Sequence, residues 1–432
     1  MQTISQLING DLKGATSVKI SQNLEYFPDE LFDLVDTLEY LDLSGNKLRD
    51  LPHDFDRFKQ LKVFFASDNL FTVYPSVLGR CNELDIVGFK SNIITHVPDE
   101  GLNGNLRWLI LTNNQLQALP ETIGKCSRMQ KLMLAGNQLK SLPVTLSACR
   151  NLSLLRLSAN QLTELPQWLL RLPNLSWLAF SGNDIKQEFV FPDIPEIDFN
   201  QCNLKELLGE GASGTIYKAE RFLANETSDV AIKIFKGNVT SDGYPEDEMK
   251  AYMASGSHPS LVKLLGKIDF HKEQKSGLVM ELIPNDFSNL GKPPSLESCT
   301  RDIFDTVTKI SVKQVLCIAA SIASVGLHLH SRGLIHGDLY AHNILINDDG
   351  ETLFGDFGAA SFYDVSKEHT AFFIERIEVK AYGYLLDDLI SICNDITHQS
   401  LVKLKELRER CLALEHNIRP SFKEIVETLA QF

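Results

Sequence analysis

The sequence predicts a multidomain protein in which an α/β solenoid of repeats precedes a separate, non-repetitive α+β domain. Asparagines recur through the N-terminal half at intervals of 23 residues, with one interval of 22, and an apolar residue stands eight positions before each of them. Self-similarity at this period is typical of a solenoid. The periodicity ends near Lys186, after which Leu204 to Glu220 has the character of a strand, a glycine loop and a second strand.

Length and composition exclude several classes of protein. The chain has 432 residues, of which 44% are hydrophobic, enough material for two or three cores. A net charge of -14 argues against a nucleic-acid partner, because such proteins usually gather Lys and Arg on one face. The N-terminus has no basic start followed by an apolar run, and we find no uninterrupted apolar stretch of membrane-spanning length, so we expect a cytoplasmic location without membrane insertion.

The repeat unit reads LxxLxLxxNxL, as in residues 106–116. One such coil cannot cover its own apolar face, so copies must stack to form a continuous core. A buried amide at each turn can bond backbone groups that the bend leaves unpaired, which accounts for the recurring residue. It stands at Asn46, Asn69, Asn92, Asn114, Asn137, Asn160 and Asn183. This unit resembles the leucine-rich repeat, and we expect such a domain over residues 1–185.

Two further features of the repeats lead to predictions. Cys81, Cys126 and Cys149 each follow their repeat asparagine by twelve positions, and we expect them to be packing residues rather than redox centres. A second column should face the concave surface, where exposed apolar side chains suggest a strip that binds a protein partner. The alternatives are scattered surface residues that bind nothing, or a face that folds against the second domain. The column consists of Tyr40, Val63, Ile86, Trp108, Lys131, Leu154 and Trp177.

The second domain should begin after a linker over residues 186–198, which contains Pro192 and Pro195, and should cover residues 199–432. Its first motif is a glycine loop with the spacing GxGxxG. Alone that motif is weak evidence, because it also opens dinucleotide-binding folds. Here the chain alternates like a strand after Gly214 instead of continuing as a helix.

Three more motifs follow in order: the strand Val230 to Lys233, the run His336 to Asn343, and the triplet Asp356, Phe357, Gly358. Together with the glycine loop they resemble the eukaryotic-type protein kinase family. The resemblance implies a two-lobed α+β domain that binds ATP and Mg²⁺ and transfers a phosphoryl group to a Ser or Thr hydroxyl of a protein.

The resemblance also implies roles for individual residues. Asp338 would accept or orient the hydroxyl proton, Lys233 would hold the phosphates, and Glu248 would pair with Lys233, with Glu246 as the second choice. Asn343 and Asp356 would bind the metal. The residues implied to contact ATP are Gly209, Glu210, Gly211, Ala212, Ser213, Gly214, Ile216, Ala231, Lys233 and, through backbone groups at the hinge after Met280, Glu281 and Ile283.

Several positions depart from the family pattern. Gly337 replaces an arginine that in many kinases reads a phosphate on the activation loop, so we expect no activation through such a phosphate. Tyr340 and His342 stand where serine/threonine and tyrosine kinases carry a lysine and an arginine. Glu378 stands where an aspartate should open the central helix, which we expect around Tyr382 to Ile392. These departures keep two alternatives open, a small-molecule phosphotransferase and a nucleotide-binding scaffold without catalysis.

Overall fold

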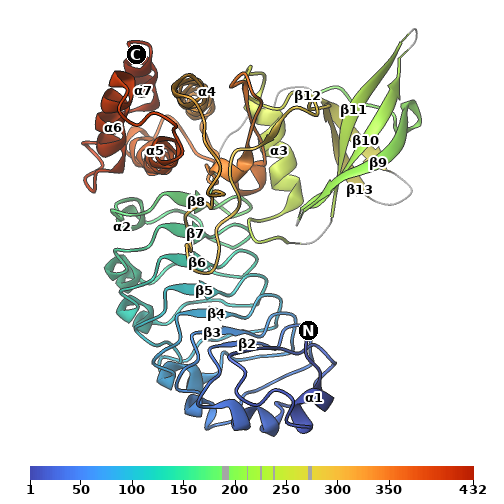
Figure 1. Ribbon diagram of the computed structural model, residues 1–432, viewed down its shortest axis with the longest axis vertical. Coiled ribbons are helices and arrows are strands. Elements are labelled where there is room, and N and C mark those ends of the chain that lie inside the picture. The colour runs from blue at the N-terminus through green and yellow to red at the C-terminus, as the bar shows by residue number, and fades with distance from the viewer. Residues whose placement is uncertain (187–193, 212, 224–225, 237–238, 271–274) are drawn as a thin grey trace. The chain divides into compact units, whose positions relative to one another are not determined.

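The computed structural model describes residues 1–186, 194–211, 213–223, 226–236, 239–270 and 275–432. The chain divides into two compact units (Figure 1). The first contains Met1–Asn174 and Asn183–Ile185, and the second contains Leu175–Gly182 and Lys186–Phe432. Residues 175–182 therefore carry the repeat pattern in sequence but belong to the second unit in space.

The first unit is a stack of short coils, each of which contributes one three-residue strand to a parallel sheet (Figure 1). Helix α1 (Ile4–Ile8) stands at its N-terminal end, where Thr3 and Gln6 form a capping box. Short 3-10 turns and the helix α2 (Gln167–Leu170) follow the strands. The strands are β1 (Ser17–Lys19), β2 (Tyr40–Asp42), β3 (Val63–Phe65), β4 (Ile86–Gly88), β5 (Trp108–Ile110), β6 (Lys131–Met133) and β7 (Leu154–Arg156).

A ladder of buried asparagines joins successive coils, as the sequence predicted. The side-chain oxygen of Asn114 accepts a 2.9 Å hydrogen bond from the N–H of Ile94. Its amide nitrogen donates to the carbonyls of Phe89 and Leu111 at 2.9 and 3.1 Å. Backbone groups that face away from the short strands are thereby paired inside the core. The predicted α/β solenoid is confirmed, and the three repeat cysteines are buried and unbridged, consistent with a packing role.

The concave column has the predicted register, because consecutive strands align Tyr40, Val63, Ile86, Trp108, Lys131 and Leu154. The expectation that every member is exposed was wrong. Ile86 and Trp177 are each 1% exposed. Neighbouring strands lie about 4.8 Å apart, so side chains of one column partly cover each other. Lys131, for example, places its ammonium 4.0 Å from the centre of the Trp108 ring. Trp177 is buried instead by Tyr340 and Tyr384 within the second unit.

The N-terminal part of the second unit is a five-stranded antiparallel sheet with helix α3 (Pro245–Ser255) beside it (Figure 1). Its core includes Ala219, Ile232, Ile268 and Val279, which belong to four different strands. In spatial order the strands are β12 (Leu264–Phe270), β13 (Lys275–Glu281), β11 (Thr227–Phe235), β10 (Gly214–Phe222) and β9 (Cys202–Glu210).

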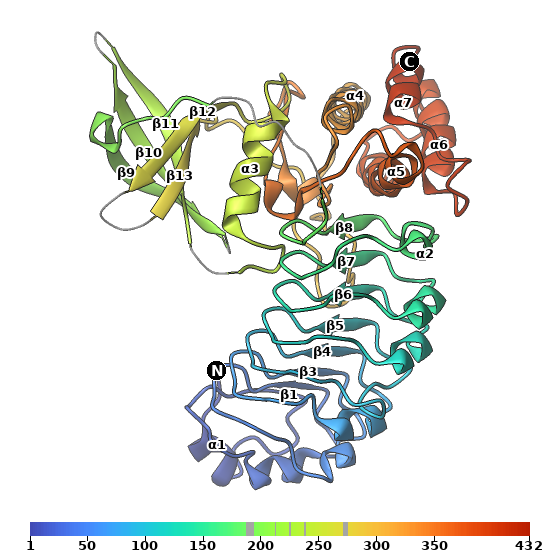
Figure 2. The ribbon, with the colours of Figure 1, turned by 180° about the vertical axis from the view of Figure 1, so that it is seen from behind.

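The C-terminal part consists mainly of helices, which cluster together in both views (Figure 2). They are α4 (Val312–His330), α5 (Glu368–Ser391), α6 (Gln399–Leu412) and α7 (Phe422–Leu429). The loops of the candidate site are carried by a small three-stranded sheet and by a strand pair. The sheet consists of β14 (Ser288–Asn289), β16 (Ile344–Ile346) and β17 (Thr352–Phe354), and the pair consists of β15 (Leu334–Ile335) and β18 (Ser361–Phe362). The predicted two-lobed α+β fold is confirmed.

Helix α4 is the one helix in the described part of the chain whose length and composition would suffice to cross a membrane. Its buried residues include Val315, Ile318 and Ile322, and the helix packs against α5 and α7. Tyr382 of α5 donates a 2.9 Å hydrogen bond to the carbonyl of Ala319 on α4. Such packing is also expected of the central helix of a folded core.

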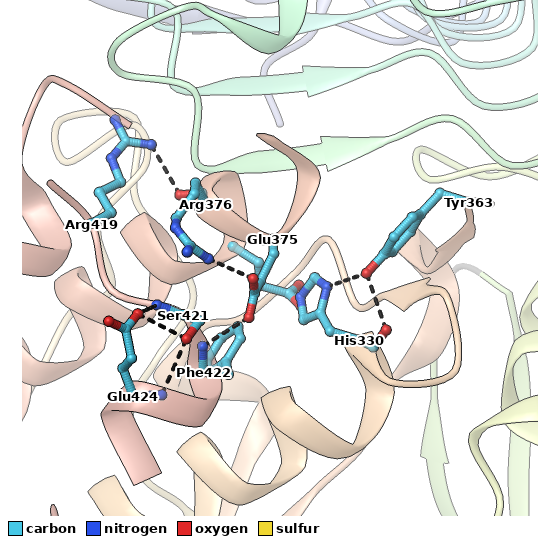
Figure 3. Close-up of polar contacts among 9 residues, drawn as sticks. His330, Tyr363, Glu375, Arg376, Arg419, Ser421, Phe422 and Glu424 are labelled. Carbon is cyan, nitrogen blue, oxygen red and sulfur yellow. Dashed lines mark hydrogen bonds and ion pairs between the residues drawn. The ribbon is translucent and has the colours of Figure 1, made fainter. Parts of the chain in front are cut away.

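The central helix α5 begins at Glu368, well before the segment expected from the sequence, so Glu378 lies within it and does not open it. The end of the chain is fastened to this helix (Figure 3). Glu375 accepts a 2.8 Å hydrogen bond from the N–H of Phe422, and buried Arg419 donates to the carbonyl of Arg376 at 3.0 Å. Glu375 therefore reaches the closing segment through a backbone N–H.

Candidate active site

The glycine loop connects β9 and β10 and is folded tightly. The N–H of Gly211 donates a 2.9 Å hydrogen bond to the carbonyl of Gly214. A side chain at Gly214 would place its Cβ 2.5 Å from the carbonyl oxygen of Ile234, so only glycine fits there. Around Gly209 there is open space, which lets a ligand approach the backbone. Glu210 pairs with Lys236 at 2.7 Å, and Ala212 lies outside the described residues.

Lys233 and Glu248 form a buried ion pair between β11 and α3. The sheet fixes Lys233, because this residue aligns with Ile216 on β10 and Leu278 on β13. Glu248 is 1% exposed, whereas Glu246 is exposed on the other side of the helix. Burial raises the pKa of the Glu248 carboxyl, as does the charge of Asp356, while Lys233 opposes the rise. The structure thus pairs Lys233 with the first-choice glutamate.

His336 anchors the start of the loop that carries the other polar groups. This residue is fully buried; it stacks on Phe354, with ring centres 4.0 Å apart, and packs against the tilted ring of Phe357 at 5.0 Å. Its Nε2–H donates a 3.0 Å hydrogen bond to the carbonyl of Gly355. Burial lowers the pKa of the imidazole, which favours the neutral ring that this packing requires. The loop and the Asp356 triplet are thereby held together.

Asp338 and Asn343 contact each other within this loop. The amide nitrogen of Asn343 donates to a carboxylate oxygen of Asp338 at 2.7 Å and to the Asp338 carbonyl at 3.0 Å. Because the nitrogen is committed to Asp338, the side-chain oxygen is the end of Asn343 that remains for a cation. The arrangement keeps one carboxylate and one amide oxygen in adjacent positions.

Asp356 has a left-handed backbone conformation, with φ 60° and ψ 79°, and its carboxylate accepts a 3.3 Å hydrogen bond from the N–H of Gly358. Phe357 next to it is fully buried, and its ring centre lies 4.6 Å from that of Tyr252 on α3. Since Tyr252 and Glu248 lie on the same helix, the triplet and the ion pair share one support.

A cavity of about 210 Å³ brings some of these residues together, but Glu248, Asp338 and Asn343 are not among the described residues that line it. The described residues that line it and were predicted from sequence are Gly211, Ser213, Gly214, Ile216, Lys233, Met280 and Asp356. Those that the sequence reasoning missed are Thr240, Asp242, Tyr252 and Gly358. The glycine of the triplet and the helix position of Tyr252 could have suggested two of these. The Ser241 to Gly243 segment suggests a turn, but nothing in it indicates which surface the turn faces.

The two hinge residues lie elsewhere. Glu281 ends β13 and donates its N–H to the carbonyl of Lys263 at 2.9 Å. Glu281 and Ile283 line a neighbouring cavity that also includes His258. Ala231, almost buried, aligns with Met280 across the sheet. The structure therefore does not bring the hinge residues into the same cavity as Lys233.

The site fits Mg²⁺ through its donor chemistry. Asp356 and Asn343 offer a carboxylate and an amide oxygen, the hard ligands that this ion prefers. Among the described residues no group of three or more His, Cys, Asp or Glu side chains forms a metal cage. Mg²⁺ in phosphoryl-transfer sites typically takes one or two carboxylates and completes its shell with phosphates and water. An incomplete protein shell is therefore the expected form.

Glu378 supports, from α5, the loop of residues 336–343 that carries Asp338 and Asn343. Its carboxylate accepts a 2.8 Å hydrogen bond from the N–H of Gly337 and contacts Nε2 of His330 at 2.8 Å. Burial alone would raise the pKa of Glu378, but His330 and the Gly337 N–H bring it below its ordinary value. The residue is fully buried as an anion and fixes the loop one position before Asp338.

His342 is held by Asp302, which accepts hydrogen bonds from the His342 N–H at 3.0 Å and from its Nδ1–H at 2.7 Å. Burial lowers the pKa of His342, but the hydrogen bond and charge of Asp302, together with Asp338 and Asp356, raise it overall. The raised pKa favours the charged form of this imidazole, which is part of the loop of residues 336–343.

Comparison with known proteins agrees with this geometry. A family model described as protein tyrosine and serine/threonine kinase matches residues 202–379. Two leucine-rich repeat models match residues 127–185 and, for the second, residues 37–58 and 105–126. A solved leucine-rich repeat protein of Leptospira interrogans is 28% identical over 42% of this chain and 52% of that one, with a TM-score of 0.35.

Two curated relatives match part of the chain. A probable serine/threonine-protein kinase of Arabidopsis thaliana is 29% identical over 164 residues, which cover 36% of this chain and 25% of the relative. Fibroblast growth factor receptor 1 of Pleurodeles waltl is 26% identical over 186 residues, or 40% of this chain and 22% of the receptor. The chain thus spans about a quarter of the length of each relative. It combines N-terminal leucine-rich repeats with a C-terminal protein kinase domain.

Proposed function

We propose that this protein transfers the γ-phosphate of Mg-ATP to Ser or Thr hydroxyls of a protein substrate. The observation that carries the proposal is the joint placement of Lys233, paired with Glu248, and Asp356 around one cavity under the glycine loop. Active protein kinases require both the lysine–glutamate pair and the metal-binding aspartate to be in place. The Lys233–Glu248 pair and the position of Asp356 at the same cavity support the proposal.

The residues divide the work of phosphoryl transfer as follows. Lys233 holds the first two phosphates of ATP. The glycine loop at Gly209 and Gly211 lies over the phosphates, because its backbone has no side chains to keep them away. Bound Mg²⁺ supplies charge neutralisation, with Asp356 and Asn343 to hold it. Asp338 orients the acceptor hydroxyl and takes its proton, and the 2.7 Å bond from Asn343 keeps its carboxylate in position. Because the transition state is loose, such placement is the main contribution of the protein.

The choice of Ser and Thr over Tyr has two kinds of support. One relative is named a probable serine/threonine-protein kinase, although the other is a growth factor receptor. His342, which occupies the position of the tyrosine-kinase arginine, is bound to Asp302 by two hydrogen bonds. Phosphoamino-acid analysis after autophosphorylation tests the choice, because phosphotyrosine as the main product would contradict it.

Activity is tested with the full chain, labelled ATP, Mg²⁺ and a panel of generic proteins and small hydroxyl compounds. We expect label in protein, and Asp338→Asn should remove it while nucleotide affinity stays unchanged. Label only in a small molecule would identify a metabolite kinase instead. Tight nucleotide binding without any transfer would favour the scaffold alternative.

We also propose that the repeats recruit a protein partner inside the cytoplasm, through the half-buried members Tyr40, Val63, Trp108 and Lys131 of the concave column. Interfaces of this kind depend on aromatic anchors. Once a substrate protein is known, Trp108→Ala should weaken its binding without altering ATP turnover. The control is Trp168→Ala on helix α2. If this variant binds the partner as tightly as the wild type does, the loss in Trp108→Ala is specific to the concave column.

A further inference from the structure

The segment that includes β8 (Trp177–Ala179) belongs to the second unit. There it packs on the loop of residues 336–343, which we call the catalytic loop because it carries Asp338. Trp177 is 1% exposed, and its indole Nε1–H donates a 3.0 Å hydrogen bond to the carbonyl of Leu339. Leu339 directly follows Asp338. A buried donor therefore fixes the peptide group next to the carboxylate proposed to orient the acceptor hydroxyl.

The indole ring is also held by two tyrosines. It stacks on Tyr340 with ring centres 4.5 Å apart and planes at 5°, and on Tyr384 with centres 5.3 Å apart and planes at 16°. Tyr340 belongs to the catalytic loop and Tyr384 to α5. Packing of the indole ring against the loop and against α5 thus sets the direction of its Nε1–H.

A second anchor lies beside the first. The hydroxyl oxygen of Ser361 accepts hydrogen bonds from the N–H groups of Phe180 and Ser181 at 2.8 and 3.0 Å. Ser361 is fully buried on β18 and aligns with Ile335 on β15, the strand that leads into the catalytic loop. The segment after β8 is therefore joined to the strand pair from which the loop starts.

Gly337 shows how close this contact is. The residue has φ 73°, and a Cβ there would lie 2.7 Å from the carbonyl oxygens of both Ala359 and Leu178. Leu178 belongs to β8, so its backbone occupies the space that a side chain at position 337 would need. The backbone of the last repeat strand therefore leaves no room at position 337 for the arginine that many kinases have there.

From these contacts we infer that Trp177 is a positioning residue that holds Asp338 in place through the Leu339 carbonyl. In kinases with an arginine at position 337, a phosphate on the activation loop can order this loop. Here the last repeat strand does so permanently and needs no phosphate. The inference rests on the proposed kinase activity and adds that its catalytic loop is ordered by repeat sequence.

The test compares Trp177→Phe with Trp168→Phe in the full chain. Phenylalanine keeps an aromatic ring for stacking but removes the N–H donor. We expect kcat of Trp177→Phe to fall about ten- to hundredfold, as for other small displacements of reacting groups, with KM for ATP unchanged. Amide hydrogen exchange of residues 337–341 should become faster. Trp168, half-buried on α2, should show neither effect.

The outcomes separate this inference from the proposed function. Unchanged kcat and unchanged exchange in Trp177→Phe would overturn it, as would equal losses in kcat and ATP affinity, which indicate general damage. If the wild-type chain transfers no phosphate, the proposed function fails. Amide hydrogen exchange of residues 337–341 in Trp177→Phe, compared with the wild type, then shows by itself whether β8 holds the loop. Should Trp177→Phe lose its fold, Ser361→Ala removes only the second anchor and must give the same changes in kcat and exchange.

Discussion

Lys233 and Glu248, fifteen positions apart, meet as a buried ion pair between a central strand and the helix beside it. Glu248 lies on the same helix as Tyr252, whose ring contacts Phe357 next to Asp356. The position of helix α3 therefore decides both whether Lys233 is oriented and whether Asp356, the aspartate proposed to bind the metal, is supported.

Lys233→Met and Asp356→Ala should each reduce phosphate transfer at least about hundredfold, because each removes a charge that stabilises the transferring phosphoryl group. Both residues line the cavity, so we expect each variant to remain folded. ADP release and circular dichroism measure the two effects. Turnover near the wild-type rate in both variants would contradict the assignment of the site.

Glu248→Gln should lower kcat about ten- to hundredfold, because a neutral amide orients the Lys233 ammonium less firmly. Glu246→Gln is the matched control, since that side chain lies exposed in the first turn of the same helix. Steady-state kinetics of both variants decides between the two glutamates. A larger loss in the control would reverse the choice.

Gly337→Ala should destabilise the protein and reduce its activity. An L-residue at a positive φ costs about 1–2 kcal/mol, and at this position a Cβ would also meet two carbonyl oxygens at 2.7 Å. Gly10→Ala is the control, because Gly10 has φ 77° and nothing within 4 Å of an added Cβ. Denaturant unfolding of both variants isolates the steric part. Equal losses would show that the contact with Leu178 and Ala359 is unimportant.

The pair of His342 and Asp302 should make stability depend on pH. The folded-state pKa of His342 lies above its ordinary value of 6.5, so the fold favours the charged ring. Its contribution is complete below about pH 6.5 and is lost as the pH rises through the raised folded-state pKa. The difference in melting temperature between wild type and His342→Gln should therefore be larger at about pH 5.5 than at about pH 8.5. The opposite order would contradict the assigned shift.

Asn114→Ala should cost about 1–3 kcal/mol of unfolding free energy, because it leaves the N–H of Ile94 and the carbonyls of Phe89 and Leu111 without their buried partner. Asn105→Ala removes an exposed amide with one hydrogen bond, to the carbonyl of Asn82, and should be nearly neutral. Urea unfolding of the two variants measures the contrast. If both variants lost a similar amount of unfolding free energy, burial of the asparagine ladder would contribute little to stability.

Periodic and local features were readable in advance. The spacing of the asparagines determined the stacked coils, because each coil buries its apolar face only against a copy of itself. Fixed spacing likewise placed Asp338 and Asn343 in one loop. The strand after Gly214 followed from its alternation, and the burial of the three repeat cysteines from their register.

Long-range features were not readable in this way. That Ile86 and Trp177 would be covered, that α5 would extend back to Glu368, and that Asp242 would face the cavity all depend on packing between segments far apart in the chain. Residues 175–182 show most clearly which features the local sequence sets and which the tertiary structure sets. Their sequence makes them a repeat, because local period alone sets the strand. Their place beside the catalytic loop was decided by the tertiary structure, since only there do Trp177 and Ser361 find their buried partners.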